Sequence, residues 1–272
     1  MENCTYSKEE LEKRIDIAVK ILKKCNNIIA FTGAGISTES GIPDFRGKDG
    51  VWKKIDPKTA TLQYFNAHPE KYWGRAAGLG SMMPIINEVT ENLPNNGHFA
   101  LAKLIKSGKL KSIITQNVDN LHQKANEMEG VSQIPVVELH GTMLTAHCLK
   151  CNEKYLRKDV IQRVRNGENP PTCLKENCDG LLKTDTILFG EQLPQKAIEE
   201  AFDFARNCDC VIVLGSSLVV FPAANVPLIA KERGAKFLII NYEPTDMDFL
   251  SDLTINGPIG KILPEIVKRI EL

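Results

Sequence analysis

The sequence predicts an α/β fold: a Rossmann-like, doubly wound parallel sheet that carries a smaller domain. Three observations indicate this. Short apolar segments with strand character alternate with helical segments along much of the 272-residue chain, which is typical of a parallel sheet. A glycine-rich loop follows the first of these strands. Two stretches, 47–95 and 146–181, interrupt the alternation and provide residues for a second domain.

The N-terminal part of the chain supplies a helix and the first strand. Ser7 and Glu10 have the spacing of a capping box, which marks the start of a helix. Apolar residues then recur at helical spacing: Leu11, Ile15, Ala18 and Leu22. Residues 27–33 follow as a short apolar strand that runs into the glycine loop.

The remaining elements alternate around the two irregular stretches. Scattered aromatic residues among Gly and Pro make 47–95 a candidate helical insertion or lid. A helix is expected at 98–107, followed by strands at 112–117 and 136–141. After the second stretch we expect a helix, a strand, a helix and a strand, in that order: 195–206, 210–217, 222–233 and 236–241.

The charge balance gives no global attraction toward a charged partner. The chain has 34 basic and 34 acidic residues, so no net field draws it to nucleic acid or to a membrane. Its N-terminal segment lacks the apolar core of a signal peptide. No apolar run approaches the roughly 20 residues of a membrane-spanning helix. We therefore expect a cytoplasmic, monomeric protein with neither a membrane nor a specific nucleic acid as its partner.

The glycine loop is a candidate phosphate-binding turn. Gly33-Ala34-Gly35 follows a strand and precedes a probable helix start, a geometry that brings phosphate to backbone N–H groups. However, Thr38 occupies the position of the third glycine of the usual fingerprint. The acidic residue expected about 20 residues later also lacks a preceding strand. Taken alone, the loop fits an ordinary strand-to-helix turn equally well.

Polar or small residues follow five of the predicted strands. Parallel sheets gather ligands at the carboxyl ends of their strands, so five such ends in one chain indicate a shared crevice. These ends are Thr32-Gly33, Gln116 to Asp119, His140-Gly141, Gly215 to Ser217 and Asn241 to Glu243. A lone histidine is more often structural than catalytic. The convergence of strand ends favours a functional role for His140, whereas His122, on a presumed helix, keeps the structural interpretation.

Four cysteines have the spacing of a structural zinc site. Cys148 and Cys151 form one pair, and Cys173 and Cys178 form a second pair 21 residues later. Four thiolates leave no open coordination position, so this zinc would be structural. Redox-active or merely buried cysteines are the alternatives, and the adjacent His147 could replace Cys148 as a ligand. We expect the other cysteines to be buried thiols: Cys4, Cys25, Cys208 and Cys210.

Taken together, these motifs resemble the sirtuin family of NAD-dependent protein deacylases, in particular its compact bacterial and archaeal members. The matching segments run in the family's order over nearly the whole chain: "GAGIS" (33–37), "GIPDFRG" (41–47), "TQNVDNLH" (115–122), "ELHG" (138–141), the four cysteines, "FGEQLP" (189–194), "GSSLVVFP" (215–222) and "NYE" (241–243). The resemblance implies a Rossmann-like NAD-binding domain and a small domain made of a helical module and a zinc-binding module. The large domain would comprise 1–46, 96–145 and 182–272, and the two modules would be 47–95 and 146–181.

The resemblance also implies a set of NAD contacts, with NAD consumed as a co-substrate. Gly33, Ala34, Gly35 and Ser37 would lie along the pyrophosphate. Asp44, Phe45 and Arg46 would form a mobile loop in which Phe45 shields the ribose. Gln116 and Asn117 would contact the nicotinamide ribose, and Asp119 the carboxamide. The adenosine half would be held by Gly215, Ser216, Ser217, Asn241, Tyr242 and Glu243, with Ile259 near the adenine.

For the reaction, the resemblance implies removal of an acyl group from lysine. His140 would be the general base, and Asn117 and Asp119 would share the catalytic site. The products would be nicotinamide, O-acyl-ADP-ribose and free lysine. An acyl-lysine peptide would lie as a strand between two segments, with contacts from Ile187, Phe189, Gly190, Glu191, Leu218 and Val219.

Two departures from the family pattern and two alternatives stay open. Thr184 replaces a common proline, with little expected consequence. Ala76 and Leu79 occupy positions where relatives that prefer acidic acyl groups carry Tyr and Arg, so we expect an apolar acyl pocket. Within the family, mono-ADP-ribosyl transfer or NAD hydrolysis is the alternative activity. A zinc-ribbon nucleic-acid-binding protein is the alternative of a different class, because lysines such as Lys150 lie near the cysteines, although acidic residues offset them.

Overall fold

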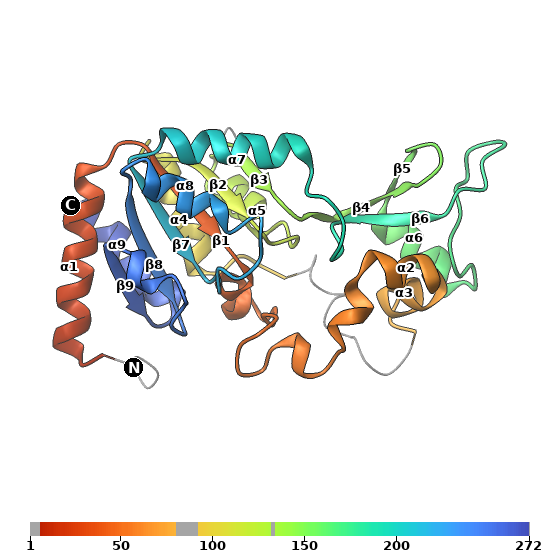
Figure 1. Cartoon of the computed structure of the whole chain (residues 1–272), viewed down its shortest axis with the longest axis horizontal. Coiled ribbons are helices and arrows are strands. Elements are labelled where there is room, and N and C mark those ends of the chain that lie inside the picture. Colours follow the sequence, from red (N-terminus) through yellow and green to blue (C-terminus); the bar gives the residue numbers. More distant parts are fainter. Residues whose placement is uncertain (1–5, 80–91, 132–133, 272) are drawn as a thin grey trace.

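The computed structural model describes residues 6–79, 92–131 and 134–271. Within these ranges the chain forms a large domain around a parallel sheet, with a smaller domain beside it (Figure 1). None of the described helices is both long and apolar enough to cross a membrane. Cys4 and residues 80–91 of the predicted helical module lie outside the described residues.

The large domain is built on a six-stranded sheet in the order β3-β2-β1-β7-β8-β9. Every neighbouring pair is parallel, which confirms the doubly wound sheet expected from the sequence. Its strands are β1 (Ile28–Thr32), β2 (Leu110–Thr115), β3 (Val136–Glu138), β7 (Cys210–Leu214), β8 (Lys236–Asn241) and β9 (Leu253–Asn256). The sequence analysis located the first five of these and missed β9.

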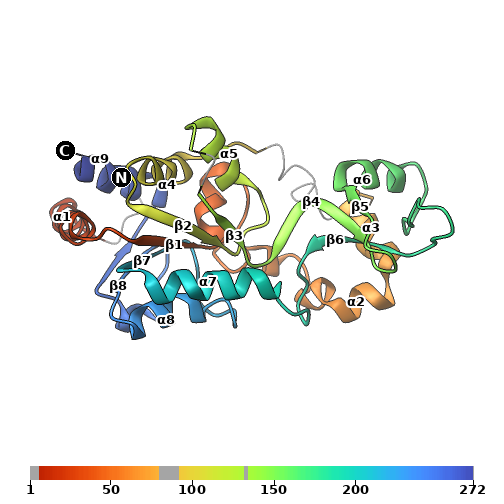
Figure 2. The same ribbon diagram turned by 90° about the horizontal axis from the view of Figure 1, so that it is seen from above.

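Helices cover both faces of this sheet (Figure 2). Ile28 and Ala30 point to one face and Ile29 and Phe31 to the other, as the two-residue period of a strand requires. The first face packs against α1 (Lys8–Lys24), α4 (Asn96–Lys106) and α9 (Ile259–Glu271). The second face packs against α7 (Gln195–Asn207) and α8 (Asn225–Glu232). A further helix, α5 (Leu121–Met128), lies beside α4.

Two helix starts show how far local sequence determined structure. Ser7 caps α1, because its side chain accepts a hydrogen bond from the Glu10 N–H at 3.2 Å. The segment after the glycine loop is helical as expected, but it is a 3₁₀-helix, η1 (Ala34–Ser40), and not an α-helix. Three more short 3₁₀-helices are η2 (Val51–Lys53), η3 (Pro57–Ala60) and η4 (Asp248–Leu250).

The small domain joins the two irregular stretches around one core. Its antiparallel sheet has the order β5-β4-β6, and Phe65, Trp73 and Val160 lie fully buried in the core beside it. The Trp73 indole donates to the Leu182 carbonyl at 2.7 Å, which links the two stretches directly. The elements are α2 (Leu62–Ala67), α3 (Pro69–Ala76), β4 (Gly141–Cys148), β5 (Lys154–Leu156), α6 (Arg157–Arg165) and β6 (Leu182–Thr186).

The predicted segment boundaries at 145/146 and 181/182 fall within or beside strands of this small sheet. β4 begins at Gly141, within the segment 96–145 that we expected in the large domain. β6 likewise opens the segment 182–272. The exact division of the chain into modules therefore stays a prediction.

Candidate active site

Hydrogen bonds join four of the five predicted strand ends. The Gln116 amide, after β2, donates to Ser216 Oγ after β7 at 2.9 Å. Asn117 donates to the Gly33 carbonyl after β1 at 3.2 Å. His140, after β3, contacts the Gln116 carbonyl at 3.0 Å. Residues far apart in the sequence thus meet at one edge of the sheet, as the pattern of strand ends predicted.

The glycine loop lies against the loop that follows β7. Gly35 donates its N–H to the Gly215 carbonyl at 2.8 Å, and a Cβ added to Gly35 would lie 2.7 Å from the Cα of Gly215. Gly215 has φ +63°, and a Cβ there would lie 2.3 Å from the Ile36 nitrogen. These glycines are therefore required by the close approach of two loops, a reason that the sequence pattern did not disclose.

Ser37, Asn117 and Asp119 form a buried polar cluster beside this contact. Ser37 Oγ donates to Asp119 Oδ2 at 2.7 Å, and the Asn117 amide donates to Ser37 Oγ at 3.1 Å. The second oxygen of Asp119 accepts the Leu121 N–H at the start of α5. All three side chains are buried, so the cluster is fixed before any ligand arrives.

His140 is held in the form that a general base needs. Its Nδ1 lies 3.0 Å from the Gln116 carbonyl oxygen. A carbonyl can only accept a hydrogen bond, so Nδ1 carries the proton and Nε2 the lone pair. Burial lowers the pKa of His140, although the hydrogen bond to Gln116 acts in the opposite direction. The ring is therefore neutral at pH 7 and can accept a proton at Nε2.

The segment around Phe189 is anchored from two sides. Its backbone N–H donates to the Ala60 carbonyl and its carbonyl accepts the Leu62 N–H, both at 3.0 Å. From the other side, the buried ammonium of Lys183 forms an ion pair with Glu191 at 3.0 Å. The main chain of Ile187 donates to the His140 carbonyl at 2.9 Å, which ties this segment to the strand end of His140.

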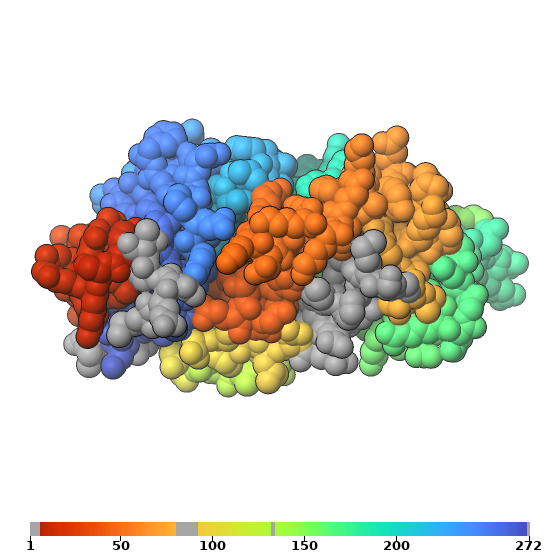
Figure 3. Space-filling view, turned by 90° about the horizontal axis from the view of Figure 1, so that it is seen from below, coloured from red at the N-terminus to blue at the C-terminus, as the bar shows by residue number. Residues whose placement is uncertain are grey.

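A row of three aromatic rings runs from the loop after the glycines to Phe189. Phe45 stacks on Trp52 with ring centroids 5.1 Å apart, and Trp52 lies 6.0 Å from Phe189. Asp44 accepts the Gly47 N–H at 2.8 Å, and Arg46 is exposed. Figure 3 shows this part of the chain, in dark orange, between the C-terminal part of the large domain, in blue, and the helical module.

The residues expected on the adenosine side are spread between surface and core. Asn241 donates to the Glu243 carbonyl at 2.7 Å, and Tyr242 is exposed. Ser217 is half-buried. Ile259 is buried in the core at the start of α9. On the peptide side, Leu218 is buried with φ +59° and Val219 is exposed. Gly190 has φ +89°.

The four predicted cysteines lie together in the small domain. Their sulfur atoms are all within 4.8 Å of one another, and Cys148–Cys178 and Cys151–Cys173 are each 3.6 Å apart. A tetrahedron with zinc–sulfur bonds of about 2.3 Å places its sulfurs roughly 3.8 Å apart, so these residues fit a zinc ion. His147 does not join them, because its Nδ1 lies 2.5 Å from Asp185.

The remaining described cysteines are buried and free, as expected: Cys25, Cys208 and Cys210. They lie apart from the four clustered thiols, which alone among the described residues form a metal-ligating group.

Several residues around the strand ends escaped the sequence analysis. Lys183 is one, because a lysine is seldom buried and its partner Glu191 meets it only in the fold. Glu138 is another: burial raises its pKa to about 7, and it lies two residues before His140 in the quoted "ELHG". The structural interpretation of His122 fits its complete burial and its 2.9 Å contact with Thr32 Oγ1.

His122 nevertheless reaches the polar cluster through two hydroxyls. Thr32 Oγ1 donates to Thr115 Oγ1 at 2.8 Å, and Thr115 Oγ1 accepts the Asn117 N–H at 3.0 Å. This chain of hydrogen bonds fixes the backbone of Asn117 from below the sheet edge.

Comparison with known proteins identifies the family. The model of the Sir2 family matches residues 33–222. The chain belongs to the Sir2 family. This confirms the resemblance to sirtuins on which the sequence analysis relied.

Relatives match this Sir2 protein over almost its full length. It is 42% identical over 254 residues to an NAD-dependent protein deacetylase of Caldivirga maquilingensis, covering 93% of each chain. It is also 42% identical over 266 residues to NAD-dependent protein deacylase 2 of Archaeoglobus fulgidus, covering 96% of this chain and 98% of the relative.

Solved structures of the family show the same fold. One described under the mechanism and regulation of Sir2 enzymes is 41% identical, with a TM-score of 0.83, and covers 96% of this chain and 98% of its own. A Sir2 complex with a p53 peptide and NAD+ is 34% identical, with a TM-score of 0.82, over 93% and 97% of the two chains.

Proposed function

We propose that this Sir2 protein is an NAD-dependent protein-lysine deacylase that consumes NAD and releases nicotinamide, O-acyl-ADP-ribose and free lysine. The observation that carries the proposal is the polar cluster at the strand ends, with His140 beside it and its Nε2 lone pair available. Its relatives are named deacetylases and deacylases, and related structures hold NAD+ or an acetyl-ADP-ribose with a peptide.

In the proposed reaction, NAD is a substrate whose nicotinamide is displaced by the acyl oxygen of the lysine amide. The Asn117 and Asp119 side chains are fixed by Ser37, so they can orient the nicotinamide end of NAD without reorganising. Phe45 and Trp52 stack over the neighbouring loop, and such a cover excludes water that would otherwise capture the activated ribose.

His140 supplies the proton transfer. Its Nε2 would accept the proton of a ribose hydroxyl, whose oxygen then attacks the acyl carbon and leads to release of lysine. The net result moves the acyl group to ADP-ribose, which makes the enzyme a transferase. The cytoplasmic location and the monomeric state stay predictions of the sequence.

We also propose that the four clustered cysteines hold one structural zinc ion. The sulfur geometry supports it, and four thiolates give a closed tetrahedral site without a position for water or substrate. Cys148 ends β4, and Cys173 and Cys178 precede β6. The ion would thus join two strands of the small sheet and contribute to its folding.

The acyl pocket is proposed to be apolar. Ala76 packs against the small-domain core, and Leu79 is half exposed at the edge of the described residues. Neither offers the charge that an acidic acyl group would require, so acetyl and longer fatty acyl groups are the expected substrates.

The test is incubation with NAD and an acetyl-lysine peptide, analysed by mass spectrometry. Formation of O-acetyl-ADP-ribose and deacetylated peptide, dependent on NAD, is the expected result. Transfer of labelled ADP-ribose to protein, or free ADP-ribose alone, would instead support the ADP-ribosyltransferase or NAD glycohydrolase alternative. Salt-dependent binding of duplex DNA would revive the nucleic-acid alternative, against which the 2.7 Å ion pair of Lys150 with Asp179 argues.

A further inference from the structure

The sulfur of Cys173 has a side-chain hydrogen-bond donor in addition to its backbone donor. Each cysteine of the cluster faces the backbone N–H two residues further along the chain. Lys150 donates to Cys148 at 3.4 Å, and the three other donors are Glu153 to Cys151, Lys175 to Cys173 and Gly180 to Cys178. At Cys173 the hydroxyl of Tyr155 is added, at 3.1 Å from the sulfur.

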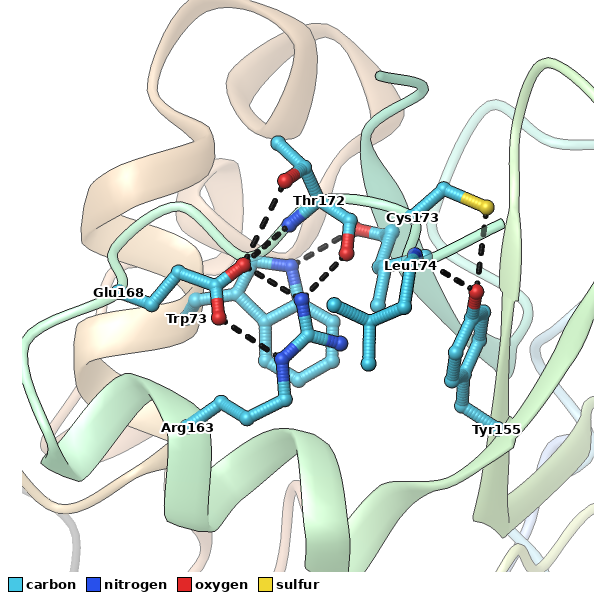
Figure 4. Close-up of polar contacts among 8 residues, drawn as sticks. Trp73, Tyr155, Arg163, Glu168, Thr172, Cys173 and Leu174 are labelled. Atoms are coloured by element: carbon cyan, nitrogen blue, oxygen red, sulfur yellow. Dashed lines mark hydrogen bonds and ion pairs between the residues drawn. The ribbon is translucent and has the colours of Figure 1, made fainter. Parts of the chain in front are cut away.

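The direction of this hydrogen bond follows from its surroundings. Tyr155 Oη accepts the N–H of Leu174 at 2.9 Å, so its own proton is free to point elsewhere. A zinc-bound cysteine is a thiolate and has no proton to give. The hydroxyl must therefore donate to Cys173. Figure 4 shows the Tyr155 oxygen between the sulfur of Cys173 and the nitrogen of Leu174.

The other side of Cys173 is fixed by an ion pair. Arg163 binds Glu168 through two nitrogens, at 2.8 and 2.5 Å, and also donates to the carbonyl of Thr172. Glu168 in turn accepts the Thr172 N–H at 3.1 Å. Arg163 lies over the Tyr155 ring at 5.9 Å, so the ion pair and the tyrosine form one unit around Cys173 (Figure 4).

We propose that Tyr155 is a positioning residue of the zinc site, and that its hydroxyl protects the Cys173 thiolate from attack and zinc loss. Four thiolates around Zn²⁺ leave a net charge of −2, which makes the sulfurs nucleophilic. A hydroxyl donor draws electron density from one sulfur and so reduces its reactivity toward protons, chelators and electrophiles. Groups that hydrogen-bond to metal ligands typically change metal affinity about 10- to 100-fold. The inference rests on the proposed zinc ion, not on the proposed deacylase activity.

The test compares Tyr155→Phe with the matched variant Tyr64→Phe, which makes the same chemical change on α2 of the same domain. Zinc content per chain is first measured by elemental mass spectrometry, and the rate of zinc transfer to a colorimetric chelator follows. We expect transfer to be about tenfold faster from Tyr155→Phe, and unchanged from Tyr64→Phe. An unchanged rate in Tyr155→Phe would overturn the proposal.

A second readout separates protection of one sulfur from general loosening. Limited iodoacetamide is applied to the zinc-loaded protein, and the labelled cysteines are mapped by mass spectrometry. Tyr155→Phe should increase labelling at Cys173 while Cys148 stays near its wild-type level. An equal increase at all four cysteines would contradict the specific role of the hydroxyl.

Failure to fold would not end the test. Glu168→Gln keeps the shape of the side chain while weakening its pairing with Arg163, and it should give a smaller increase that again appears first at Cys173. Wild-type protein purified without zinc would overturn both this inference and the zinc assignment. The peptide assay on that same preparation would show separately whether the deacylase proposal holds.

Discussion

The strand-end cluster and the cysteine cluster are two preorganised polar sites built in opposite ways. The cysteine cluster uses one segment of 31 residues, from 148 to 178, and local contacts position its sulfurs. The strand-end cluster joins Gly33, Asn117, His140 and Ser216 across more than 180 residues of chain. Local spacing is therefore enough to recognise the first site, whereas the second exists only because parallel strands end at one edge of a sheet.

The comparison also separates stability from catalysis. The metal would hold the small domain together, because its core is small and its sheet has only three strands. The strand-end cluster lies on a six-stranded sheet with helices on both faces, so the large domain does not need it to fold.

The largest expected effect is loss of the zinc site. Cys148→Ser should remove the ion and unfold the small domain, since structural zinc contributes on the order of 10 kcal/mol to such modules. Hydrogen exchange should show lost protection in β4 and β6 with protection retained in β1 and β7. Equal loss in both sheets would mean that the two domains do not differ in their dependence on the metal.

Next in size is the removal of the proposed general base. His140→Ala should reduce deacylation by about 10²- to 10⁴-fold while NAD still binds and the zinc content is unchanged. Steady-state kinetics and calorimetric titration with NAD measure the two effects. Full turnover by this variant would refute the assignment of His140.

A smaller effect is expected from the ion pair that holds the peptide segment. Lys183→Met removes the partner of Glu191, and a half-paired ion pair loses roughly 1 to 3 kcal/mol. Since Glu191 also accepts the Leu188 N–H at 2.6 Å, the segment should loosen. The peptide KM should rise more than kcat falls. Lys196→Met, on the exposed start of α7, is the control.

The smallest effect concerns two buried histidines beneath the strand-end cluster. Their rings lie 4.9 Å apart, and burial lowers the pKa of both His98 and His122 to about 3. The unfolded chain takes up protons near pH 6.5, so each histidine stabilises the fold above that pH. This stability is lost as the pH falls from about 6.5 toward 3, by roughly 1.4 kcal/mol per pH unit for each ring.

Urea unfolding between pH 7 and pH 5 measures this dependence. His122→Gln should be less stable at pH 7 and should show a shallower loss of stability than the wild type as the pH falls. His68→Gln, in the small domain, should keep the wild-type slope. If the slopes of wild type and His122→Gln coincide, His122 does not titrate on unfolding.

Much of the architecture could be predicted because it depends on short-range patterns. The apolar strand at 27–33, the cap at Ser7 and the four cysteine positions all follow from neighbours within a few residues. The family motifs then predicted the set of strand ends. Two elements escaped this reading. The strand β9 has only four residues, too few for a clear two-residue period, and α9 contains Pro264, which normally argues against a helix.

By itself, the sequence determined the fold class, the family and the types of residue at both sites, because apolar periodicity and motif spacing are properties of the chain. Tertiary structure alone decided that Gly35 and Gly215 are needed where two loops touch. It also decided that His147 pairs with Asp185 instead of joining the cysteines, and that Lys183 is buried against Glu191. Each of these depends on residues distant in sequence, and a side chain's partner is fixed only when the packing brings them together.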